Sequence, residues 1–204
     1  MKRVLWLTVL ALALPLTAFA DSVDFTNSGG ILAGSSNGLS LTGSALIAVK
    51  GLNGLGLVTG NHLGSLSFST GALMAGGSLQ MGGTFAAGGS FLITGNGTNG
   101  IPNGAIFSGT FSGPATWTLV TLANGTHNYT LSGAVNGTWY NGSAVFGATT
   151  QLTINTGRGF FNGTTSISSG DTNIVTSVPE PGTLGLLGTG LVGIAGAMHR
   201  KFKS

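Results

Sequence analysis

The 204-residue chain is poor in charge and rich in glycine, with 5% charged residues and 38 glycines. In ordinary soluble domains about 25% of residues are charged and about 7% are glycine. The segment from Asp21 to Ser177 contains two basic and three acidic residues, so it carries a net charge of −1. A coiled coil, an intracellular helical protein and a nucleic-acid binder are excluded, and so are disulfides, thiolate catalysis and Cys-ligated metals because the chain has no cysteine.

The first segment has the pattern of a secretory signal peptide. The basic pair Lys2-Arg3 precedes an apolar run at residues 4–14, and small residues end at Ala20 before Asp21. An uncleaved anchor helix is the alternative, but such a run reaches about 16 Å, short of the roughly 30 Å bilayer core. We therefore expect a signal helix at residues 1–20, passage through the export machinery, and cleavage by signal peptidase between Ala20 and Asp21.

Residues 21–177 are predicted to form one secreted all-β domain. Apolar and polar residues alternate in short runs at Ser65–Ser69, Tyr129–Ser132 and Gln151–Asn155, which is typical of half-buried strands. The apolar face changes between Trp117 and Leu122, which predicts a bulge or a strand buried on both sides.

Asn-Gly dipeptides punctuate this domain and indicate tight turns. Asn-Gly tolerates the positive φ angles that type I′ hairpins need, so an antiparallel sandwich or barrel-like sheet with Asn-Gly hairpins is the predicted fold. The nine dipeptides begin at Asn37, Asn53, Asn96, Asn99, Asn103, Asn124, Asn136, Asn141 and Asn162.

One segment allows another architecture. Over residues 64–99, Leu73, Leu79, Phe85 and Phe91 recur every six residues behind small pairs. This period suits a short β-solenoid, whose coils need a regular inward apolar residue. Strands with glycine turns give the same register, so both readings stay open.

The domain offers little for catalysis. Asp171 with Asp24 or Asp21 is the one carboxylate pair that could flank a glycosidic bond. His62 and His127 stand in turn-like contexts and are predicted to be solvated loop residues. We expect no catalytic residue, no metal ligand, no cofactor and no enzymatic activity. A surface hydrolase acting through His127 or His62 is a third, weaker hypothesis.

Aromatic residues give sugar binding a better basis. Trp139 and Tyr140 precede Asn141, so aromatic faces stand beside an amide partner. Core packing is the competing interpretation for Trp139, and more so for Trp117.

The final segment, residues 178–204, has three parts in order. Pro179, Glu180 and Pro181 form a non-helical start, because neither proline donates a backbone hydrogen bond. An uncharged stretch at 183–198 follows and predicts a transmembrane helix, and a basic tail at 199–204 indicates a cytoplasmic end. A plain C-terminal anchor has the same pattern.

This order of Pro-Glu-Pro, apolar segment and basic tail resembles the PEP-CTERM sorting signal. The resemblance implies that Pro179, Glu180 and Pro181 are recognised by an exosortase, a membrane-embedded transpeptidase, while the 183–198 helix holds the chain in the inner membrane until processing. It also implies a bacterial host and a final place in the cell envelope or on the surface, commonly beside exopolysaccharide.

These observations together predict an exported, non-enzymatic cell-surface or extracellular-matrix protein associated with exopolysaccharide. The alternative is a polysaccharide-binding module with a defined aromatic site. Nucleic acid is not an expected partner.

Overall fold

The computed structural model describes residues 21–176. The expected signal helix with Ala20, the Pro179–Pro181 motif, the 183–198 helix and the 199–204 tail lie outside the described residues, and Asp21 begins the first strand. The elements are β1 (Asp21–Ser28), β2 (Ile31–Ser35), β3 (Gly38–Lys50), the 3-10 helix η1 (Leu52–Gly54), β4 (Leu57–Ser69), β5 (Gly83–Phe85), β6 (Gly88–Asn96), β7 (Asn103–Phe111), β8 (Ala115–Thr121), β9 (His127–Trp139), β10 (Ala144–Asn155), β11 (Thr164–Ser166) and β12 (Ser169–Thr176).

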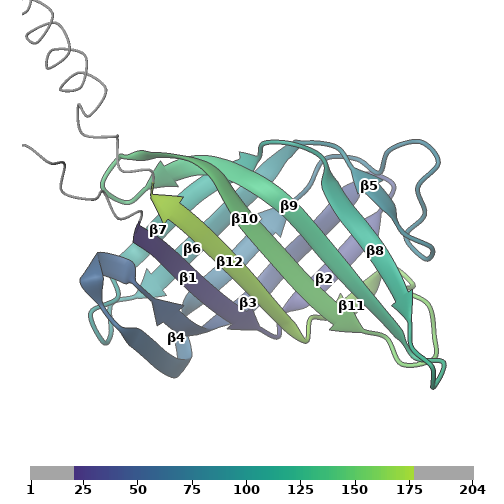
Figure 1. The fold of residues 1–204 in the computed structure, drawn as a ribbon, viewed down its shortest axis with the longest axis horizontal. Coiled ribbons are helices and arrows are strands. Elements are labelled where there is room, and N and C mark those ends of the chain that lie inside the picture. Colours follow the sequence, from purple (N-terminus) through teal and green to yellow (C-terminus); the bar gives the residue numbers. More distant parts are fainter. Residues whose placement is uncertain (1–20, 177–204) are drawn as a thin grey trace, which may run out of the picture. The chain divides into compact units, whose positions relative to one another are not determined.

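The strands form a closed antiparallel barrel, which confirms the all-β prediction (Figure 1). Eight strands neighbour one another in the order β1, β12, β10, β9, β7, β6, β4 and β3, and β3 pairs again with β1. Closure depends on β1, where Asp24 lies opposite Asn173 on one side and opposite Lys50 on the other. A closed barrel satisfies the backbone groups that a sheet edge would leave open.

The remaining strands prolong this barrel at one end. β2 pairs with β3 and β11, and β8 pairs with β5 and β9. The break between β1 and β2 requires glycine, because Gly30 has φ 81° and an added Cβ would lie 2.6 Å from the backbone of Ser44.

Aromatic side chains fill the interior. Phe68 meets Phe111 edge to face with ring centroids 5.7 Å apart, and Phe107 meets Trp139 in the same way at 5.9 Å. Trp117 and Trp139 are 1% and 7% exposed, so the core interpretation is right for both. The buried side chains of the described strands form one hydrophobic core.

The solenoid alternative over residues 64–99 is wrong. β4 and β6 pair antiparallel, with Leu66 opposite Ile93, and β5 joins the same sheet through β8. The four apolar residues that recur every six positions do contribute to the core. Phe85 and Phe91 are buried, and Leu73 and Leu79 pack against the core. Phe85 and Phe91 lie in β5 and β6, whereas Leu73 forms an isolated bridge and Leu79 lies in a turn, so neither a solenoid nor one continuous strand produces this period.

Two local predictions also need correction. Val120 faces outward and is 48% exposed, so β8 has neither the predicted bulge nor two buried faces there. Among the nine Asn-Gly asparagines, all of which are described, Asn53 and Asn99 have positive φ. At Gly125 and Gly142 the glycine alone takes the left-handed conformation, so the type I′ geometry is wrong for those turns.

Candidate functional site

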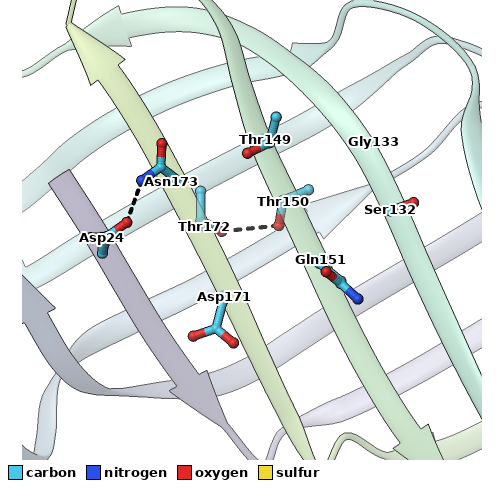
Figure 2. A pocket seen from close by; sticks show the side chains of 9 residues that line it. All are labelled: Asp24, Ser132, Gly133, Thr149, Thr150, Gln151, Asp171, Thr172 and Asn173. Carbon is cyan, nitrogen blue, oxygen red and sulfur yellow. Dashed lines mark hydrogen bonds between the residues drawn. The ribbon is translucent and has the colours of Figure 1, made fainter. Parts of the chain in front are cut away.

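A hollow lined mainly by polar residues lies on the outer wall of the barrel, over β1, β12, β10 and β9 (Figure 2). Its volume is about 590 Å³ and it is open to solvent. We call it the wall hollow. It is lined by Asp24, Ser132, Gly133, Thr149, Thr150, Gln151, Asp171, Thr172 and Asn173.

Strand alternation decides which side chains face the solvent here. On β12, Thr172 and Ile174 are buried, so Asp171 and Asn173 stand on the outer face between them. Register then aligns neighbours across the strands: Asp171 lies opposite both Gln151 and Thr26.

Cross-strand pairing also aligns the outward residues two positions further along these strands. Asn173 lies opposite Asp24 on β1 and Thr149 on β10. The two carboxylates of the hollow therefore sit on adjacent strands in adjacent rows. Of the carboxylate pairs considered from the sequence, the structure brings Asp24 and Asp171 together on one face.

Each carboxylate is held by one neighbour. The Thr26 hydroxyl donates to Oδ1 of Asp171 at 2.8 Å, and the Asn173 amide donates to Oδ1 of Asp24. Within residues 21–176, the second oxygen of each carboxylate makes no hydrogen bond to protein. Those oxygens are available as acceptors for a ligand.

A buried hydrogen bond joins the two central strands of the hollow on their inner face. The hydroxyls of Thr150 and Thr172 lie 2.9 Å apart and are buried, joining β10 to β12 (Figure 2). This bond fixes the two strands that carry Gln151 and Asp171 on the other face. The outer groups are thus presented by a rigid support.

The lining offers carboxylate, amide and hydroxyl groups and no aromatic ring. Such groups donate to and accept from the hydroxyls of a ligand in many combinations. Within the described part of the chain, His, Asp and Glu side chains form no group of three or more that could hold a metal ion. The arrangement suits recognition of a hydroxyl-rich molecule.

The histidines lie elsewhere in the barrel. His62 is exposed on β4, whereas His127 is 8% exposed on β9. The ring of His127 stacks on Phe160 with centroids 4.4 Å apart, and its Nδ1 lies 3.0 Å from the Thr121 hydroxyl. The prediction of a solvated loop residue is therefore wrong for His127, because its strand turns the ring inward. His62 is solvated as predicted, but it lies within a strand and not in a loop.

Of the two rings in the alternative aromatic site, Trp139 and Tyr140, one is exposed. Trp139 packs against Phe25 and Phe107 in the core. Tyr140 is 48% exposed, and its hydroxyl donates to Oδ1 of Asn53. Tyr140 does not line the wall hollow.

Sequence reasoning missed the wall hollow. Its only local signal is the alternation of polar residues at Thr149 and Gln151 and at Asp171 and Asn173. Which strands become neighbours, and in which register, is not written in those runs.

Within residues 21–176, none of the helices is both long and apolar enough to cross a membrane. Comparison with curated proteins and with solved structures finds no match. Comparison with protein families finds the PEP-CTERM protein-sorting motif at residues 177–201, which contain Pro179, Glu180 and Pro181. That motif implies an extracellular protein sorted by an exosortase, with export to the cell envelope or surface. The chain thus carries the PEP-CTERM protein-sorting motif at residues 177–201, and its residues 21–176 form a closed antiparallel β-barrel.

Proposed function

We propose that this protein is a non-enzymatic component of the bacterial cell surface or extracellular matrix and associates with exopolysaccharide through the outer wall of its barrel. The wall hollow carries the proposal. It offers hydroxyl, amide and carboxylate groups on a rigid sheet, as a polyhydroxyl ligand requires. The hollow is open to solvent on the outer wall, where a polymer can reach it.

The proposed route to the surface uses both ends of the sequence. Signal peptidase cuts between Ala20 and Asp21, and the 183–198 helix then holds the chain in the inner membrane. Exosortase recognises Pro179, Glu180 and Pro181 and removes the tail.

The non-enzymatic part rests on the wall hollow's chemistry. Asp24 and Asp171 each accept a hydrogen bond from a neutral neighbour, and neither His62 nor His127 lines the hollow. A binding role asks only for such fixed donors and acceptors, whereas hydrolysis would also need one carboxyl group to act as a proton donor. Of the two rings named in the alternative of a binding module with an aromatic site, Tyr140 is exposed and Trp139 is buried.

Processing is tested by intact mass and terminal sequencing of the protein recovered from its native envelope and medium. We expect a chain that begins at Asp21 and ends near Pro179–Pro181. A chain that retains residues 183–204 would make the protein a simple membrane-anchored one and would overturn the proposed route.

Association is tested by co-sedimentation of the purified mature chain with exopolysaccharide from the same cells. We expect retention on the polysaccharide with no release of reducing ends. Absence of retention overturns the association. Release of reducing ends that disappears in Asp171→Asn overturns the non-enzymatic role.

A further inference from the structure

We infer that the wall hollow is the middle of an extended site for an uncharged polysaccharide, whose chain lies across the strands and not along them. This inference rests on the proposed association with exopolysaccharide and adds the place, the direction and the class of the polymer.

The direction follows from a continuous polar row. Cross-strand register aligns one outward residue from each of five adjacent strands, which we call the central row: Thr116 (β8), Ser132 (β9), Gln151 (β10), Asp171 (β12) and Thr26 (β1). All five are exposed or half-buried, and the inward residues between them carry the core. A row of this length exceeds what a single small sugar would contact.

Parallel rows flank the central row on both sides. Thr118, Thr130, Thr153 and Ser169 lie in register on one side, while Thr149, Asn173 and Asp24 lie on the other. Neighbouring strands are about 4.8 Å apart, so hydrogen-bonding groups repeat at that interval across the wall. A polymer of sugar rings repeats its hydroxyl groups at a comparable interval, so successive rings meet successive strands.

Charge decides the class of polymer. Asp24 and Asp171 are the charged residues that line the hollow, and both are acidic, while Lys50, opposite Asp24 on β3, lies outside the lining. A carboxylate accepts hydrogen bonds from sugar hydroxyls more strongly than a neutral acceptor does. The same charge repels the carboxylate or sulfate groups of an acidic polysaccharide at this distance. The site therefore favours uncharged chains over polyuronates.

The test is affinity electrophoresis of the mature chain in gels that contain either a soluble β-1,4-glucan or a polyuronate, at matched ionic strength. We expect the glucan to retard the wild-type protein and the polyuronate to leave it unaffected. Gln151→Ala and Asp171→Ala should each weaken glucan binding about tenfold, as expected for the loss of a hydrogen bond to a fixed or charged group.

Two further variants keep the result interpretable. Thr94→Ala changes an outward residue of β6, across the barrel from β12, and should bind glucan as the wild type does. The double variant Asp24→Asn, Asp171→Asn keeps the shape of the hollow and removes its charge, so it should gain affinity for the polyuronate. Near-ultraviolet circular dichroism of the tryptophans confirms that each variant is folded.

The outcomes separate this inference from the proposed function. Retention on native exopolysaccharide with no effect of Gln151→Ala or Asp171→Ala overturns the site and leaves the association standing. Equal wild-type binding to glucan and polyuronate, or binding to the polyuronate alone, overturns the class. Absence of binding to native exopolysaccharide overturns the proposed function and this inference together.

Discussion

The ring of Trp117 lies nearly parallel to the ring of Tyr129, with centroids 5.0 Å apart and an interplanar angle of 16°. The two side chains donate hydrogen bonds to consecutive backbone carbonyls in the loop between β4 and β5. Trp117 Nε1 donates to Leu79 O at 2.9 Å, and Tyr129 Oη donates to Gln80 O at 2.7 Å. This stacked pair therefore ties the segment between β4 and β5 to the barrel core. The Tyr129 hydroxyl also accepts from the Phe161 backbone N–H at 3.1 Å, so it joins a second connection.

Tyr129→Phe should lower the free energy of unfolding by about 2 kcal/mol, because it leaves the buried Phe161 N–H and the Gln80 carbonyl without their partner. Urea denaturation followed by tryptophan fluorescence measures this loss. Tyr140→Phe is the matched control, since its hydroxyl bond to Asn53 is exposed, and should change stability by less than about 0.5 kcal/mol. Equal effects of the two changes would contradict the role given to Tyr129.

Adjacent phenylalanines should differ in their contribution to stability. Phe161 is 1% exposed and packs edge to face on Trp117, whereas Phe160 is 45% exposed. Phe161→Ala should cost about 3–5 kcal/mol, the usual result of emptying a buried aromatic site. Phe160→Ala should cost clearly less, because it removes only the stack on His127. Thermal unfolding of both variants tests the order, and a reversed order would place the wrong ring in the core.

Because the Thr150 and Thr172 hydroxyls bond to each other behind the wall hollow, the stability losses from replacing each of them should not add. Thr150→Val leaves the buried Thr172 hydroxyl without its partner and should cost about 1–3 kcal/mol. The double variant Thr150→Val, Thr172→Val removes both groups and should be nearly as stable as the wild type. A double-mutant cycle in urea measures the coupling. Strictly additive losses would show that the two hydroxyls do not depend on each other.

Gly109 and Gly56 should respond oppositely to alanine. Gly109 lies opposite Gly137, and a Cβ on it would overlap the Asn136 carbonyl oxygen and stand 2.9 Å from Gly137 Cα. Gly109→Ala should therefore destabilise the barrel by about 3 kcal/mol. A Cβ on Gly56 meets nothing within 4 Å, so Gly56→Ala should be neutral or stabilise by up to about 1 kcal/mol. Soluble yield and melting temperature compare the two, and tolerance of alanine at Gly109 would contradict the close approach of β7 and β9.

Local pattern was enough for much of the fold. The alternations at Ser65–Ser69, Tyr129–Ser132 and Gln151–Asn155 all lie in strands, and the burial of Trp117 could be expected from its size and surroundings. Local pattern was not enough for His127. A turn-like context of polar neighbours hid the fact that position 127 begins a strand whose odd-numbered residues face the core.

Short-range features of the chain are enough to predict the all-β class and the sorting motif at residues 177–201. Apolar alternation sets which face of a strand is buried, and the Pro-Glu-Pro motif is recognised as a linear segment. Closure of the sheet through β1 and the placement of Asp24 and Asp171 on one wall follow instead from the pairing of strands that are distant in the chain. Strand register sets both. Thr26 and Asp171, which are 145 residues apart in the chain, become neighbours through ladder hydrogen bonds and core packing over the whole barrel, and no short segment encodes that choice.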